Sequence, residues 1–199
     1  MAKEHSRKTK VREQRKLLVI VCEGEKTEQI YFERYKKGRP GLSIKMPNTN
    51  YTDPKNLVKF ALTQIEKLGI DPKNGDDIWC VFDCDNNPNT HILTACKNAG
   101  KRVKICLSNP SFELWYLLHF AYNESPLTNP VLMAQLERKI NGYKKTEDYF
   151  DLLESSRETA IKNAKKINNL HESNGIDLFS TESNPSTHVY KIVEDILKY

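Results

Sequence analysis

Three short apolar runs decide what this chain can fold into. They read KLLVIVC (16–22), IWCVFD (78–83) and VKICL (103–107), and each is rich in Val, Ile, Leu, Cys and aromatic residues. A continuous apolar run of this length is typical of a parallel strand that is covered on both faces. Helical patterns separate the runs. The sequence therefore predicts an α/β fold, a mainly parallel sheet flanked by helices.

The connecting segments carry ordinary helix start and stop signals. Asp53 as N-cap and Pro54 at the first helical position begin a helix that continues to Leu68, and Gly69 ends it. The same reasoning predicts helices at 27–37 and 91–99 and a short strand at 42–46.

From Pro110 onward the pattern becomes helical, with no convincing strand. The tetrapeptide SNPS occurs at 108–111 and again at 183–186, and Asn as N-cap with Pro next would start a helix in both places. We expect one domain over residues 17–199, with an α/β core at about 17–109 and a C-terminal helical extension at about 110–199.

The positive charge is concentrated at the N-terminus. Residues 1–16 hold seven Lys and Arg against two Glu, and this surplus equals the net charge of +5 of the whole chain. A flexible basic arm of this kind can contact a nucleic-acid backbone through charge alone. The alternative is a solvated leader without a partner.

The chain has no apolar run near the roughly 20 residues that span a bilayer, and its N-terminus lacks the pattern of a secretory signal. We therefore expect a cytoplasmic protein that does not bind a membrane. The five cysteines are an odd number, and their spacing favours buried free thiols over a zinc site.

Acidic residues follow two of the predicted strands. Glu23 comes directly after the run at 16–22, Asp83 is the last residue of the run at 78–83, and Asp85 lies two residues farther on. Ligands of an open parallel sheet bind at the carboxyl ends of the strands, where these three carboxylates would converge. Because side chains alternate in an extended segment, the two aspartates should face the same side. Oxygen ligands of this kind suit Mg²⁺ or Mn²⁺.

The residues after Glu23 suit a phosphate group. Gly24 lets a backbone approach closely, and Lys26 and Thr27 lie where the next helix begins. Glu25 is either a further acid of the site or a first-turn residue favoured by the helix dipole.

Four further groups have two readings each. Glu113 either completes the metal site or complements a helix dipole, and Trp115 with His119 forms either a core face or a catalytic group. Ser186 and Thr187 either reach a phosphate or cap a helix. Lys144 and Lys145, like the lysines of 162–166, either line a nucleic-acid groove or form a solvated face.

Two motifs carry a family resemblance. VIVCEGEKTE with VFDCDNN resembles the Toprim signature of topoisomerases, primases and nucleases. Together with SNPSFELWYLLHF and the late NPST, they resemble the RloB family of restriction–modification and abortive-infection loci. The resemblance implies a Toprim-like fold and a metal-dependent nuclease, with Glu23 as general acid or base and Asp83 and Asp85 as metal ligands. Many members carry another acid or a basic residue around the aspartate pair, where Cys84, Asn86 and Asn87 stand here, and this departure leaves the choice between one and two metals open.

Two functions remain open from the sequence. The first is a Mg²⁺- or Mn²⁺-dependent nuclease that cleaves DNA or RNA, such as tRNA, as a bacterial antiphage effector. The second is a module without turnover that binds a Mg²⁺-nucleotide or a partner ATPase, since the resemblance implies that related systems contain one. Self-association into a homo-oligomer is also left open.

Overall fold

The computed structural model describes residues 15–24, 26–85 and 87–199. Most of the predicted basic arm, and Glu25, lie outside the described residues. Lys16 is the first residue of β1 (Lys16–Cys22), and its N–H donates to the carbonyl of Gly41 (3.0 Å). The arm predicted over residues 1–16 therefore ends before Lys16.

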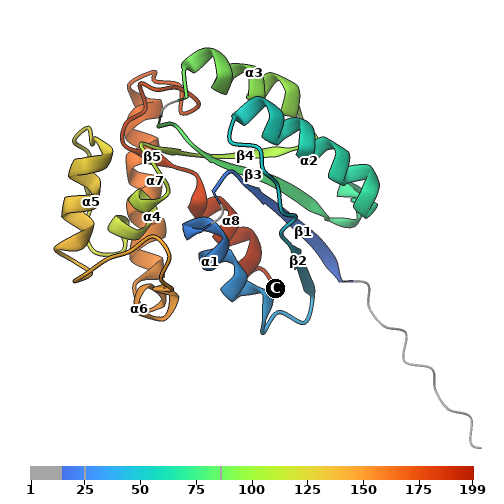
Figure 1. The fold of residues 1–199 in the computed structure, drawn as a ribbon, viewed down its shortest axis with the longest axis horizontal. Helices are drawn as coiled ribbons and strands as arrows, with labels where there is room; N and C mark the ends of the chain where they lie inside the picture. The colour runs from blue at the N-terminus through green and yellow to red at the C-terminus, as the bar shows by residue number, and fades with distance from the viewer. Residues whose placement is uncertain (1–14, 25, 86) are drawn as a thin grey trace, which may run out of the picture.

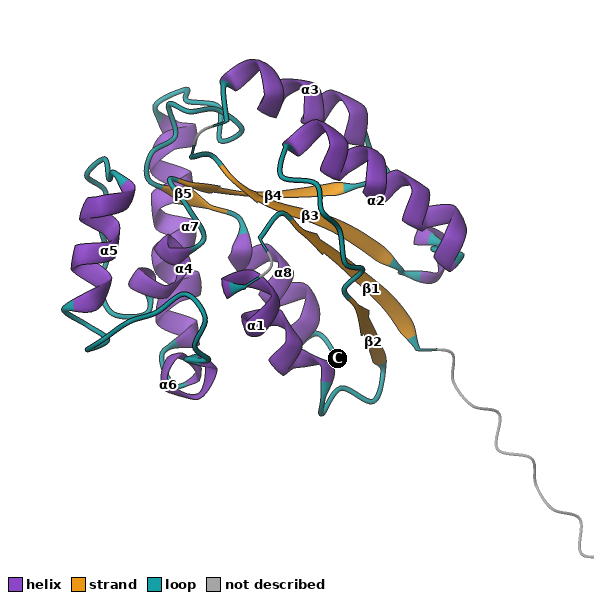
Figure 2. Cartoon of the chain, viewed as in Figure 1, coloured by secondary structure: helices purple, strands orange, loops and turns teal. Residues whose placement is uncertain are grey.

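One five-stranded sheet forms the middle layer of the molecule (Figure 2). Its order is β2-β1-β3-β4-β5, with bounds Leu42–Lys45 for β2, Asp77–Asp83 for β3, Lys104–Asn109 for β4 and Ser186–Thr187 for β5. β2, β1, β3 and β4 are parallel, whereas β5 pairs antiparallel with β4. The expected mainly parallel sheet is confirmed.

Helices cover both faces of the sheet (Figure 1). They are α1 (Thr27–Glu33), α2 (Pro54–Leu68), α3 (Asn89–Ala99), α4 (Glu113–Leu118), α5 (Asn129–Glu137), α6 (Phe150–Glu154), α7 (Arg157–Ser173) and α8 (Val189–Leu197), with 3-10 turns at Arg34–Lys36 and Pro72–Asn74. α2 and α3 pack on one face through Leu57 and Ile92, whereas α1, α4 and α8 pack on the other. β1 contributes side chains to the cores on both faces, because Ile20 faces one side of the sheet and Val21 the other.

The helix signals read from the sequence work as expected around α2. Asp53 accepts a hydrogen bond from the N–H of Asn56 (3.0 Å), and Pro54 is the first helical residue. Gly69 ends the helix in the left-handed conformation, with φ of 64°.

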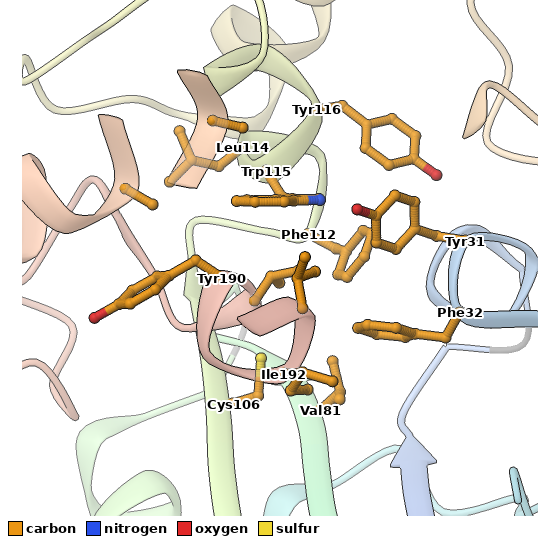
Figure 3. Close-up of a cluster of buried hydrophobic side chains, with 14 of the residues drawn as sticks. Tyr31, Phe32, Val81, Cys106, Phe112, Leu114, Trp115, Tyr116, Tyr190 and Ile192 are labelled. Carbon is orange, nitrogen blue, oxygen red and sulfur yellow. The ribbon is translucent and has the colours of Figure 1, made fainter. Parts of the chain in front are cut away.

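An aromatic cluster joins α1 to α4 (Figure 3). Tyr31 of α1 packs edge-on against Phe112 and Trp115, with ring centroids 5.8 and 6.4 Å apart, and tilts against Tyr116 at 5.8 Å. All four rings are almost fully buried. This packing fixes the two helices that follow the ends of β1 and β4.

The two SNPS segments do not start helices, so that prediction is wrong. Asn109 is the last residue of β4, and Asn184 comes just before β5; both Asn–Pro bonds are cis. Their side chains bind loops instead: Asn109 donates to the carbonyls of Ser180 and Thr181, and Asn184 pairs with the backbone of Leu127. β5 also shows that the extension after residue 110 contains a strand.

All five cysteines are free, and four of them are buried, as expected. Among the described residues, none of the helices combines the length and the apolar character that a membrane crossing requires.

Candidate metal and phosphate site

Glu23 and Asp83 meet at the carboxyl ends of neighbouring strands. Cys22 of β1 pairs with Val81 of β3, and the N–H of Glu23 continues the ladder by donating to the carbonyl of Val81 (2.9 Å). The N–H of Asp83 in turn donates to Glu23 Oε2 (3.2 Å). The expected approach of these two acids is confirmed.

A cleft of about 540 Å³ opens at this edge of the sheet. Its walls are formed by the β1–α1 segment, the loop before α2, the end of β3, the start of α4 and the α5–α6 loop. The lining residues are Glu23, Gly24, Lys26, Thr27, Glu28, Thr49, Asn50, Thr52, Asp83, Glu113 and Lys145. Of the residues that the structure describes, four carboxylates therefore share this cleft with two lysines.

Glu28 is the acid that sequence reasoning missed. It lies in the first turn of α1 and is only 7% exposed. A Cβ on Gly24 would collide with the Glu28 carboxylate, so glycine is needed at position 24 to let this acid approach. A signal was present, because Glu28 shares helical spacing with the buried Tyr31, Phe32 and Tyr35.

Glu113 also reaches the cleft, from the first residue of α4, and is 1% exposed. Its Oε1 accepts from Thr27 Oγ1 (3.2 Å) and pairs with Lys145 Nζ (3.0 Å). Its Oε2 accepts from Ser111 Oγ (2.8 Å). Both oxygens of this buried carboxylate therefore have donors.

The cleft is electrostatically unfavourable for its acids. Burial, followed by repulsion from Glu28, Glu113 and Glu23, raises the pKa of Asp83 well above its usual range. Burial raises the pKa of Glu23 to about 7, against the hydrogen bond from Asp83. The pKa of Glu28 is also raised, first by burial. Burial lowers the pKa of Lys145, but Glu113, Asp83 and Glu28 together leave that pKa raised.

Asp83 Oδ1 is buried and has no hydrogen-bond partner among the described residues. A buried carboxylate oxygen without a donor is costly, and either protonation or a bound cation removes that cost. Among the residues described, no three Asp, Glu, His or Cys side chains already stand together as metal ligands. Mg²⁺, however, usually binds through one or two carboxylates and keeps several waters. Asp83 and its acidic neighbours fit that donor set.

Asp85 does not lie in this cleft. It is exposed and lines a second hollow, where Asn129 Nδ2 donates to its Oδ2 (2.5 Å). The chain bends after Asp83, so the alternation of an extended strand no longer applies. The expectation that Asp83 and Asp85 face the same side is wrong.

The other candidates divide between the cleft and the core. Lys26 and Thr27 line the cleft, and Lys145 reaches it, whereas Lys144 pairs with Glu147 (3.1 Å) and is not among the lining residues. His119 belongs to the core, where its Nδ1 lies 2.8 Å from the carbonyl of Trp115 and burial lowers its pKa to about 4.

Ser186 and Thr187 are fully buried in β5. Their hydroxyls form hydrogen bonds with those of Ser183 (2.9 Å) and Ser108 (2.8 Å). Neither side chain lines the carboxylate cleft. Thr187 Oγ1 accepts from the N–H of Val189, the first residue of α8 (3.3 Å), whereas Ser186 lies in β5 and not at a helix start, so the capping reading is wrong for Ser186.

Comparison with known proteins adds one match. Comparisons with curated proteins and with solved structures returned none. The family model described as RloB-like protein matches residues 18–196, from β1 to α8, and so includes every strand and helix that builds the cleft. The chain therefore belongs to the RloB-like family.

Proposed function

We propose that this protein is a metal-dependent nuclease that hydrolyses phosphodiester bonds of nucleic acid. The observation that carries the proposal is the buried Asp83 Oδ1, which has no hydrogen-bond partner within the described part of the chain, in a cleft where that part supplies four carboxylates. Such a cluster at the carboxyl edge of a parallel sheet suits a hard divalent cation.

Asp83 and Glu28 would hold Mg²⁺ or Mn²⁺. The bound ion supplies Lewis-acid stabilisation of a phosphoryl oxygen and a more acidic bound water. Glu23 lies beside Asp83 and is placed to accept or return a proton, the role that the family resemblance implies for it. Lys26 adds positive charge on the wall of the cleft.

A nucleic-acid substrate is favoured by two features. The basic N-terminal segment provides a sequence-independent attraction for a phosphate backbone, and two lysines, Lys26 and Lys145, line the cleft beside its acids. The role of an antiphage effector, the cytoplasmic location and a partner ATPase rest on the family resemblance and the sequence alone, and they stay part of the proposal.

The test uses the purified full-length chain with labelled plasmid DNA, total RNA and tRNA. We expect cleavage of at least one substrate with Mg²⁺ or Mn²⁺, none with chelator, and none by Asp83→Asn. Equal background cleavage by the wild type and Asp83→Asn would contradict the proposal. Tight Mg²⁺-nucleotide binding without turnover would instead support the alternative of a binding module.

A further inference from the structure

Glu113 differs from the other acids of the cleft in how its oxygens are used. Lys145, Thr27 and Ser111 supply donors to both of its oxygens. Asp83 Oδ1, in contrast, is buried, and no residue that the structure describes donates to it. A cation gains most by binding the unsatisfied oxygen, and binding Glu113 would first require breaking an ion pair. The four carboxylates are therefore not equivalent as metal ligands.

Lys145 is held in the cleft by its loop as well as by its charge. Thr27 Oγ1 lies 3.2 Å from the carbonyl oxygen of Lys145. Farther along the α5–α6 loop, Asp148 forms an ion pair with Arg34 of the α1 side (2.9 Å). Tyr143 and Tyr149 pack their rings 5.1 Å apart and thereby close the loop on itself. These contacts anchor the loop around Lys145, and the ion pair with Glu113 holds its ammonium in the cleft.

The Lys145 side chain is 52% exposed, whereas its partner Glu113 is 2% exposed. An ammonium has three N–H donors, and the ion pair needs only part of this capacity. Lys145 lines the wall of the cleft and is half-exposed, so its remaining N–H donors can reach a ligand there. The neighbouring Lys144 pairs with Glu147 on the same loop and does not line the cleft.

We propose that Lys145 contacts a phosphate oxygen of bound nucleic acid, and that Glu113 positions this ammonium instead of binding metal, so the cleft holds one divalent ion per chain. Lys145 then supplies the positive charge that a second ion supplies in two-metal sites. This inference rests on the proposed function, because it assigns the nucleic-acid ligand to the same cleft.

The first experiment counts metal ions. Isothermal titration with Mn²⁺ should give one site per chain for the wild type. Glu113→Gln should keep that site, because Gln retains the shape and one acceptor oxygen, whereas Asp83→Asn should lose it. Two sites in the wild type, or loss of the site in Glu113→Gln, would overturn the inference.

The second experiment measures binding without turnover. A short fluorescent single-stranded oligonucleotide, as RNA and as DNA, is titrated in Ca²⁺ over a series of salt concentrations. Lys145→Met should weaken binding about tenfold or more, the usual scale of one charge-assisted contact. The slope of log affinity against log salt should fall by about 0.7, the value for one phosphate contact on a single strand.

Two variants serve as controls for folding and for charge. Lys145→Met leaves Glu113 buried without its partner, so the double variant Lys145→Met with Glu113→Gln keeps the pair neutral and should show the same loss. Lys67→Met makes the same change of charge on an exposed position of α2. It should keep both the affinity and the salt slope. Melting curves establish that each variant is folded.

The outcomes separate this inference from the proposed function. Unchanged oligonucleotide binding by a folded Lys145 variant, with metal binding intact, would overturn the inference and leave the nuclease proposal standing. A wild type that binds neither Mn²⁺ nor the oligonucleotide would overturn both. Loss of affinity and of salt slope in Glu113→Gln, with its metal site retained, would support the positioning role, because a purely structural defect would not remove one phosphate contact selectively.

Discussion

The Asp83→Asn variant should be more stable than the wild type in the absence of metal. The change removes a buried charge that Glu28, Glu113 and Glu23 repel. One repulsive pair at an effective dielectric constant of about 20 corresponds to roughly 1 to 3 kcal/mol. At about 2 to 4 °C per kcal/mol for a chain of this size, the melting temperature should rise by several degrees.

The sign of the pH dependence follows from the raised pKa of Asp83. A carboxyl whose folded pKa lies above its unfolded value carries no penalty below the unfolded pKa and the full penalty above the folded one. The gain from Asp83→Asn should therefore be present at pH 8 and small near pH 4. Thermal melting in chelator at the two pH values measures it.

Added Mn²⁺ should reverse the order of stability. An ion that binds only the folded wild type stabilises it according to its concentration over its dissociation constant, and Asp83→Asn should lack this response. Asp85→Asn makes the same chemical change two residues away, outside the cleft, and should keep the Mn²⁺ response. If Asp83→Asn is less stable than the wild type in chelator at pH 8 and still responds fully to Mn²⁺, the electrostatic reasoning is refuted.

Four further predictions follow from single features. Glu28→Gln should raise the melting temperature in chelator at pH 8 and weaken Mn²⁺ stabilisation, while Glu33→Gln, on the exposed end of α1, should do neither. Gly24→Ala should fold but bind Mn²⁺ more weakly, because its Cβ displaces the Glu28 carboxylate; equal titration curves for the two proteins would count against this. Burial lowers the pKa of His188 from 6.5 to about 4, so its contribution to stability is lost as the pH falls through that window; urea unfolding should show that His188→Gln loses about 2 kcal/mol less than the wild type between pH 7 and 5. Deleting residues 1–14 should leave the melting temperature unchanged and weaken nucleic-acid binding mainly at low salt, and unfolding of the truncated chain would refute this.

The strand and helix pattern of the core was predictable because each element depends on local chemistry. Each of these strands has a continuous apolar middle, Leu18–Cys22 in β1, Ile78–Phe82 in β3 and Ile105–Leu107 in β4, and the α2 signals lie within a few residues of its ends. β5 was not predictable in this way. It has two residues, and only its pairing with Ser108 and Asn109 of β4, distant in the sequence, makes it a strand.

The candidate site was partly predictable for the same reason. Glu23 and Asp83 follow strands whose neighbourhood is fixed by the parallel topology, so their approach could be inferred. The prediction that Asp85 faces the same side as Asp83 failed because the strand ends at Asp83 and a bend follows. Lys145 reaches the cleft through a loop that Arg34 and Thr27 hold, and contacts across more than a hundred residues leave no local pattern.

The aromatic cluster opposes the electrostatic repulsion among the carboxylates of the cleft. Repulsion among the four carboxylates favours separation of α1, which carries Glu28, from α4, which carries Glu113. Tyr31 packs against three rings of the Phe112–Tyr116 segment and opposes that separation (Figure 3). Burial of each large aromatic side chain contributes roughly 1.5 to 3 kcal/mol, comparable to one repulsive pair. The burial of these rings therefore offsets the electrostatic cost of the cleft. Replacing Tyr31 with a smaller side chain should loosen the carboxylate arrangement, even though the Tyr31 ring lies in the core.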